Sequence, residues 1–163
     1  MSIEIEINDF YGRRTSFREL GIKLKRVLVT EAKDDIYDVL VTGGQNIRNR
    51  IIKSMRDSPK TGKLYFVRMQ GSKRIMHRAS SPGNYPRPSS GDLIRSIQMD
   101  ERIDEVEVGS MITKSNYPMF LEKGTARMAA RPWLERSFKA YEPDIKRNLM
   151  RALRDAAGRL GAS

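Results

Sequence analysis

The sequence contains no cysteine among its 163 residues, and it has one histidine and one tryptophan. Without cysteine the chain can form neither disulfides nor thiolate metal sites, and a reducing compartment is the default expectation. No apolar run approaches the roughly 20 residues that a membrane span needs. The N-terminal stretch MSIEIEINDF also lacks the basic-then-apolar order of a signal peptide. We therefore expect a protein that is made and used in a cytoplasm, without export by a cleaved signal.

The residues that most enzymes need for catalysis are equally scarce. Histidine-based nucleophilic catalysis would depend entirely on His77, which lies beside Arg78 in a basic stretch. The carboxylates are scattered, and neither a phosphate-binding glycine loop nor zinc-ligand spacing is present. The sequence therefore favours a protein that is not an enzyme and has no cofactor and no metal, with His77 as a surface polar residue. An enzyme that uses His77 as a base is the less favoured alternative.

Acidic residues are nearly absent from one segment of the chain, residues 46–87. This segment contains eleven Lys and Arg residues and one acid, Asp57, so its net charge is +10. The rest of the chain carries 20 basic and 19 acidic residues, within a total net charge of +11. We expect a nearly neutral domain with one basic element, and a polyanion or an acidic protein surface as the partner of that element.

Hydrophobic periodicity predicts the elements of the N-terminal half. Alternating isoleucines predict a strand over residues 2–7, and helical spacing predicts a helix over residues 16–29. A longer apolar stripe runs from Ala32 to Met55, and this helix should end near Asp57. Gly43 and Gly44 fall on that stripe where bulky residues are expected, which indicates a close backbone approach or a bend.

Two hairpins follow, separated by a loop. The first is expected at 63–69 and 73–78, around Gly71-Ser72, and the second at 97–102 and 105–110. Residues 80–91 hold three prolines and two glycines and should form no regular structure. A short helix over 92–96 should be capped by Ser89 or Ser90.

The C-terminal third predicts a short helix and a long one. Residues 117–123 should form one to two turns stopped by Gly124 in the left-handed conformation, and Pro132 should open the long helix. Pro143 should kink or split the long helix. Its buried stripe is expected to contain Trp133, Phe138, Tyr141, Ile145, Leu149, Leu153, Ala156 and Leu160.

These elements together predict an α+β fold, in which a small antiparallel sheet of hairpins packs against long N-terminal and C-terminal helices. The expected organisation is a single domain over residues 1–163. It would include an N-terminal arm at 1–15 and an extended basic hairpin and loop at 58–90.

The basic hairpin is the first candidate site, and three interpretations of it stay open. Tyr65 and Phe66 among the cations could stack on nucleic-acid bases. Alternatively, Phe66 and Val67 pack inward and the cations form a solvated face, or the hairpin docks on an acidic protein ring. The residues expected to contact a partner or DNA are Arg56, Lys60, Lys63, Arg68, Lys73, Arg74, Arg78 and Arg87.

The second candidate is the block at residues 115–138. Its aromatic residues favour a structural corner that joins the sheet to the C-terminal helix, with Phe120 and Trp133 in the core. Cations around small residues would suit a tight contact between subunits instead. The corner residues are Tyr117, Phe120, Gly124, Thr125, Arg131, Pro132 and Trp133.

Short motifs follow one another between residues 40 and 138 in a specific order. They are TGKL at 61–64, ASSPG at 79–83, GDL at 91–93 with Ser96-Ile97, Val108-Gly109, YPMFLEKGT at 117–125 and ARPWL at 130–134. In this order the chain resembles tailed-phage tail-completion and head–tail joining proteins, the group that includes lambda minor tail protein Z-like proteins. Ser90 stands where the second Thr-Gly step of that family has threonine. Residues 2–7 and 13–30 have no clear counterpart.

The resemblance implies a structural protein of the virion, in the tail or neck, that is assembled in the host cytoplasm. Such proteins act as a homo-oligomeric ring, expected here to be a hexamer, at the head-proximal end of the tail. The implied partners are neck or connector proteins, the tail terminator or tail tube, and the packaged DNA. A ring needs head-to-tail contacts between its subunits. The alternative function is that of a small basic nucleic-acid-binding protein.

Overall fold

The chain has an α+β fold, as the sequence predicts. The computed structural model describes residues 30, 32–102, 105–112 and 115–161, so the expected elements at 2–7 and 16–29 and the N-terminal arm at 1–15 lie outside the described residues. The elements are α2 (Lys33–Arg56), β1 (Leu64–Gln70), β2 (Lys73–Arg78), α3 (Asp92–Ser96), β3 (Ile97–Arg102), β4 (Glu105–Ser110), α4 (Tyr117–Lys123) and α5 (Leu134–Gly161).

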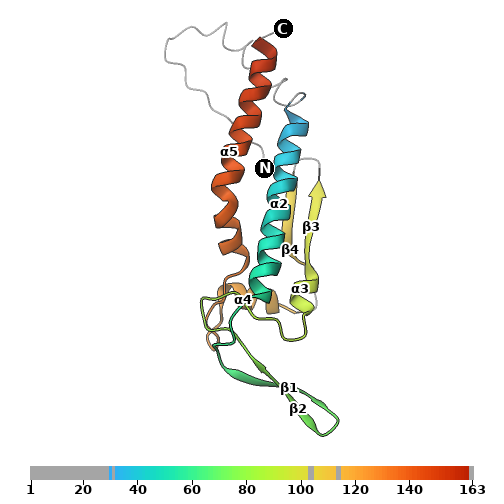
Figure 1. Cartoon of the computed structure of the whole chain (residues 1–163), viewed down its shortest axis with the longest axis vertical. Helices are drawn as coiled ribbons and strands as arrows, with labels where there is room; N and C mark the ends of the chain where they lie inside the picture. Colours follow the sequence, from blue (N-terminus) through green and yellow to red (C-terminus); the bar gives the residue numbers. More distant parts are fainter. Residues whose placement is uncertain (1–29, 31, 103–104, 113–114, 162–163) are drawn as a thin grey trace.

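Helix α2 is the central element of the body. It lies between α5 on one side and the β3–β4 hairpin on the other (Figure 1). The strands form two separate antiparallel ribbons, β1–β2 and β3–β4. Only β3–β4 lies along α2, while β1–β2 projects from the end of the body that carries α3 and α4 (Figure 1). We call this projecting ribbon, residues 63–78, the arm, and the term does not refer to the N-terminal arm expected at 1–15.

Gly43 and Gly44 explain how α2 can have close neighbours on two sides. A Cβ atom at Gly43 would lie 2.8 Å from Cδ1 of Ile145 on α5. A Cβ atom at Gly44 would lie 2.7 Å from Cγ1 of Val106 and 2.8 Å from Sδ of Met99, both on the β3–β4 ribbon. Such distances are well inside van der Waals contact, so the expected close approach at these glycines is confirmed.

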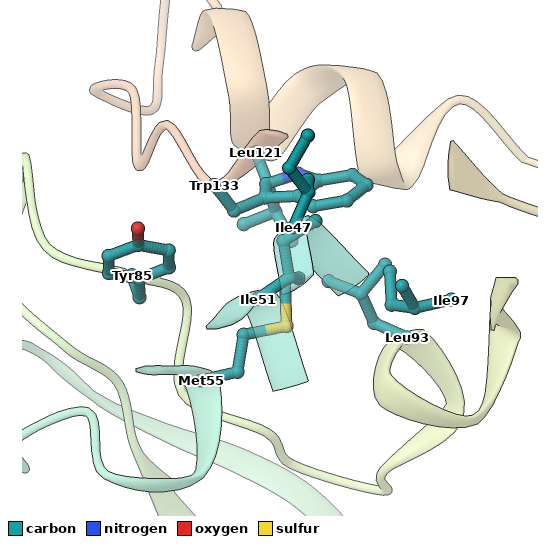
Figure 2. Packing of buried hydrophobic residues seen from close by; sticks show 8 residues of the cluster. All are labelled: Ile47, Ile51, Met55, Tyr85, Leu93, Ile97, Leu121 and Trp133. Atoms are coloured by element: carbon teal, nitrogen blue, oxygen red, sulfur yellow. The ribbon is translucent and has the colours of Figure 1, made fainter. Parts of the chain in front are cut away.

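The main core lies at the C-terminal half of α2. Ile47, Ile51 and Met55 recur at four-residue spacing, which places them on one face of the helix, and all three are buried. Figure 2 shows Trp133 and Leu121 near the Ile47 end of this row, with Tyr85 on one side of the row and Leu93 and Ile97 on the other. The core thus joins α2, α3, α4, β3 and the start of α5.

The buried stripe of α5 differs from the expected one at Phe138. This side chain is 50% exposed, whereas its neighbour Ser137 is fully buried. Ser137 lies four residues before Tyr141 on the inward face, and its hydroxyl donates to the carbonyl of Trp133 at 2.6 Å. Phe138 is one residue out of phase with that face, about 100° around the helix. Helix α5 also continues through Pro143 without being split there.

The expected serine cap of α3 is wrong as well. Gly91, with φ of 84°, occupies the N-cap position, and no side chain there caps the helix. The Ser90 hydroxyl, one residue upstream, accepts the amide hydrogen of Asp92 at 3.3 Å. Both hairpins otherwise begin and end within a residue of the expected positions.

Candidate functional site

The motifs at 61–64, 79–83, 117–125 and 130–134 meet at the base of the arm, although up to about 70 residues separate them in the sequence. We call this hydrogen-bonded unit the corner. Its chain segments exchange backbone hydrogen bonds: Gly62 N to Ala79 O at 2.8 Å, Gly83 N to Ala130 O at 2.9 Å and Arg131 N to Leu121 O at 2.7 Å. The sequence predicts the corner only at 115–138, and the structure extends it to the two ends of the arm.

The two strands of the arm leave the corner as a closely held pair. Besides the Gly62–Ala79 bond, the amide of Ala79 donates to the carbonyl of Lys63 at 3.0 Å. A Cβ atom at Gly62 would lie 2.3 Å from the carbonyl oxygen of Ser80, so only glycine allows this approach. The Ser81 hydroxyl adds a 2.9 Å bond to the Thr61 hydroxyl. These contacts fix the position from which the arm projects.

Arg131 ties the loop after the arm to helix α4. Its side chain is buried, and its Nε donates to the carbonyl of Ser80 at 3.1 Å, while its own amide donates to Leu121. A buried guanidinium with these bonds is a structural residue and is not a surface cation. Arg131 therefore supports the interpretation of residues 115–138 as a corner.

Glu122 is a corner residue that the sequence-based list omits. One of its carboxylate oxygens accepts the amides of Trp133 at 2.7 Å and Leu134 at 2.9 Å, and the other accepts the amide of Glu135 at 2.9 Å. These are free amides at the start of α5, where a negative charge is also favoured by the helix dipole. The cap of α5 therefore comes from α4. Helix α5 begins at Leu134, so the expectation that Pro132 occupies its first position is wrong, and Pro132 lies two residues before the helix.

Gly124 ends α4 as predicted, but in a different conformation. Its φ is 78° and its ψ is −179°, which is a region open essentially to glycine alone and is not the left-handed helical region. A Cβ atom there would lie 2.9 Å from both the amide nitrogen of Ala130 and the carbonyl oxygen of Met128. Gly124 thus serves both the turn and the close packing. Thr125, next in the chain, pairs with Met128 through backbone bonds of 2.7 and 3.2 Å.

The aromatic residues of the corner divide into buried and exposed ones. Trp133 is buried, and its Nε1 donates to the carbonyl of Pro118 at 3.2 Å. Phe120 is 41% exposed, so the expectation that it lies in the core is wrong. Leu121 takes the inward position of α4 instead, and Tyr117 and Met119 are exposed beside Phe120 on the same helix.

The arm carries most of the expected contact cations, and they are exposed: Lys63, Arg68, Lys73, Arg74 and Arg78. Arg56 at the end of α2 and Lys60 in the following loop are exposed nearby, whereas Arg87 lies outside the arm and donates to the carbonyl of Ser58 at 2.8 Å. In the part of the chain that the structure describes, none of these eight residues forms an ion pair. The arm therefore projects an uncompensated positive charge.

The apolar side chains of the arm are exposed too. Phe66 is 55% exposed, and Leu64, Tyr65, Val67 and Met76 are between 41% and 45% exposed. The interpretation in which Phe66 and Val67 pack inward is therefore wrong. A two-stranded hairpin by itself is at best marginally stable in water, and contiguous exposed apolar residues mark contact surfaces. The arm combines both properties with its positive charge.

Successive strand residues point to opposite faces of the arm. Phe66 pairs with Met76 across the strands, and the guanidinium of Arg74 lies 5.9 Å from the centre of the Phe66 ring, so these three side chains share one face. Tyr65 pairs with His77 on the opposite face, where the ammonium of Lys63 lies 5.8 Å from the Tyr65 ring. Each face thus offers an aromatic ring beside a cation.

His77 is half-buried on the arm. Burial, helped by the positive charge of Arg87, lowers the pKa of this imidazole from its ordinary value, so the neutral form is favoured. Within the described residues, no group of three or more His, Asp or Glu side chains gathers in a way that could hold a metal ion.

A groove of about 530 Å³ lies beside the core, between α2 and the loop that carries Tyr85. Arg50 lines it, with its guanidinium 5.9 Å from the centre of the Tyr141 ring. Burial raises the pKa of Tyr85, but hydrogen bonds to Ser137 and Arg50 outweigh burial and lower it overall. Polar and charged side chains of α2 line the groove together with Tyr85 and Tyr141, and the Tyr85 hydroxyl is hydrogen-bonded to the Ser137 hydroxyl at 3.1 Å.

Comparisons of the chain with protein-family models, with curated proteins and with solved structures found no match. None of the helices among the described residues has the length and apolar character needed to cross a membrane.

Proposed function

We propose that the chain is a structural subunit of a tailed-phage virion. Copies form a ring at the head-proximal end of the tail, and this ring completes the tail and makes the surface to which the filled head docks. The proposal rests on the resemblance of the motif series between residues 40 and 138 to tail-completion and head–tail joining proteins. Its main structural support is that four of these motifs, at 61–64, 79–83, 117–125 and 130–134, meet in one unit, the corner.

The division of the molecule into body and arm suits this role. The body has a buried core and a corner rich in hydrogen bonds, so it can keep its shape within an assembly. The arm extends from it with exposed apolar side chains and with cations that form no ion pair among the described residues. A ring with another ring or tube stacked on it needs contacts that reach beyond each subunit, and the arm can supply them.

The experiment is electron microscopy of particles that the encoding phage makes when this chain is missing. Separate filled heads and finished tails are the expected products, because head docking would lack its surface. Supplying the chain from a plasmid should restore joined particles. Tails of uncontrolled length would assign the chain to tail termination instead, and normally joined particles would contradict the proposal.

A nucleic-acid-binding protein is the second candidate, and the exposed Tyr65 and Phe66 among exposed cations favour it. Aromatic side chains between cations can stack on bases, and contacts to phosphates make affinity fall steeply with salt. Titration of nonspecific duplex DNA at several salt concentrations tests this function. Strong affinity with a steep log–log salt slope would support it, and no binding at low salt would exclude it.

A further inference from the structure

The arm has a complementary surface on the chain itself. Its own residues include five cations and no acid. The strands β3 and β4 contain four acids, Asp100, Glu101, Glu105 and Glu107, and one cation, Arg102. Basic and acidic surfaces are thus separated onto the two hairpins, of which β1–β2 projects from the body and β3–β4 lies along α2 (Figure 1).

The acidic residues lie mainly on the outer face of β3–β4. Met99, Val106 and Val108 point toward Gly44 of α2, so alternation places Asp100 and Glu107 on the opposite face. Asp100 and Glu107 pair directly across the two strands. Like charges opposite each other are unfavourable, and Arg102, 3.2 Å from Asp100 and 3.5 Å from Glu107, is the cation that offsets them. A second cation would be favoured there.

An open position lies beside this acidic pair. Gly109 is the next residue after Glu107 on the same face, and a Cβ atom at Gly109 would meet nothing within 4 Å. Glycine within a strand often marks a place where another chain approaches, and an aromatic ring can cover it. Glu107 and Gly109 lie two residues apart along the strand, which is a distance of roughly 7 Å. That length is close to the 5.9 Å between the Arg74 guanidinium and the Phe66 ring centre.

We propose that the arm of one copy docks on the outer face of the β3–β4 ribbon of a second copy. Phe66 covers Gly109, and Arg74 binds between Asp100 and Glu107. The two surfaces differ, so the contact is head-to-tail, and a pair of copies keeps one free arm and one free ribbon for further contacts. Repetition of such a contact gives a ring if it closes. The inference deepens the proposed function, because it assigns the contact from which the ring would be built.

A second copy fits the arm better than nucleic acid does. A duplex would attract the cations, but it offers no position matched to Phe66, Leu64 and Met76, which share one face and are all exposed. The β3–β4 ribbon offers both the acids and the uncovered Gly109. Contact with DNA therefore becomes an outcome of the test.

The test reverses charges on the two surfaces of the full-length chain separately. The arm variant is Arg74→Glu. The ribbon variant combines Asp100→Lys, Arg102→Glu, Glu105→Lys and Glu107→Lys, which exchanges the sign of every charge on that face and so preserves its internal ion pairs. The control is Arg154→Glu, an exposed residue of α5 with the same charge change as the arm variant. Circular dichroism and thermal melting check that each variant is folded.

Sedimentation velocity over a range of concentrations measures association. We expect the wild type and the Arg154 control to self-associate, and each reversed variant alone to associate about tenfold more weakly or less. A mixture of the two reversed variants should associate more tightly than either variant alone, because the Arg74→Glu position then meets lysines and the unchanged arm meets the unchanged acids. A sedimentation experiment with Gly109→Val, which fills the open position, should also show weakened association.

Several results would overturn the inference: a wild type that stays monomeric, an Arg74→Glu variant that associates normally, or a mixture that stays dissociated. Association that occurs only with added duplex DNA would assign the arm to nucleic acid and would also overturn the inference.

The proposed function would be contradicted by different results. Particles that join normally without the chain would contradict the function even if the mixture associates. Conversely, a normally associating Arg74→Glu variant that still restores particle joining would remove only this contact.

Discussion

The corner and the arm are adjacent in the chain, but they differ in what their surfaces contact. In the corner, Arg131, Trp133 and Glu122 satisfy backbone groups of distant segments, and glycines allow the segments to touch. In the arm, rings and cations point to solvent on both faces. The difference teaches that the corner is folded by interactions within the chain, whereas the arm has a surface for an interaction outside it.

Replacement of Trp133 by alanine should have the largest effect on stability. The indole is buried in the core and its Nε1 is hydrogen-bonded, so Trp133→Ala should lower the free energy of unfolding by about 3–5 kcal/mol. Phe120→Ala is the matched control in the same corner, and it should cost less than about 1 kcal/mol because Phe120 is exposed. Urea denaturation measures both. A loss below about 1 kcal/mol for Trp133→Ala would show that the corner is not core.

Gly62→Ala should have the next largest effect. The added Cβ would lie 2.3 Å from the carbonyl oxygen of Ser80, and that backbone cannot move without loosening the base of the arm. We expect a loss of about 1–3 kcal/mol in the same denaturation series. Gly158→Ala, at an open position of α5, should instead stabilise the chain by up to about 1 kcal/mol. Equal effects of the two substitutions would contradict the close approach at Gly62.

The cap supplied by Glu122 should matter to a smaller degree. Glu122→Ala leaves three amides at the start of α5 without their acceptor, and it should cost about 1–2 kcal/mol. Glu122→Gln keeps one oxygen and loses the charge, so its cost should lie between that of alanine and zero. Thermal melting followed by circular dichroism gives both values. An unchanged melting temperature for Glu122→Ala would mean that the capping bonds contribute nothing.

The arm should show the opposite pattern. Phe66→Ser removes an exposed ring, so it should change the free energy of unfolding by less than about 0.5 kcal/mol. The same substitution should weaken self-association, because the ring lies at the centre of the proposed contact. A large loss of stability with unchanged association would reverse the comparison between the arm and the corner.

Local patterns in the sequence predict most of the fold. The helical stripe from Ala32 to Met55, the turn at Gly71-Ser72 and the stop at Gly124 are signals within a few residues, and each was found at its expected place. The errors at Phe138 and Phe120 have one cause. Periodicity shows that a helix has an apolar face, but residues of other segments decide which position points inward.

The candidate site was predictable only in part. The charge of the arm is visible in the sequence, whereas its exposure depends on how the other described segments pack, which local patterns do not encode. Glu122 was missed because it caps a helix 11 residues away, a relation without sequence spacing of its own. Its place inside the motif at 117–125 was the one available signal. The link from Arg131 to Ser80 spans 51 residues and could not be derived from spacing at all.

The most direct test of the account is sedimentation velocity of a chain whose arm is shortened to its first cross-strand pair, Leu64 and Arg78. Residues 65–77 are replaced by Asn-Gly, which keeps Leu64, Arg78 and the bonds at Gly62 and Ala79. The account predicts a folded chain with the helical content of the wild type that stays monomeric at concentrations where the wild type associates. A shortened chain that associates like the wild type, or one that fails to fold, would contradict it.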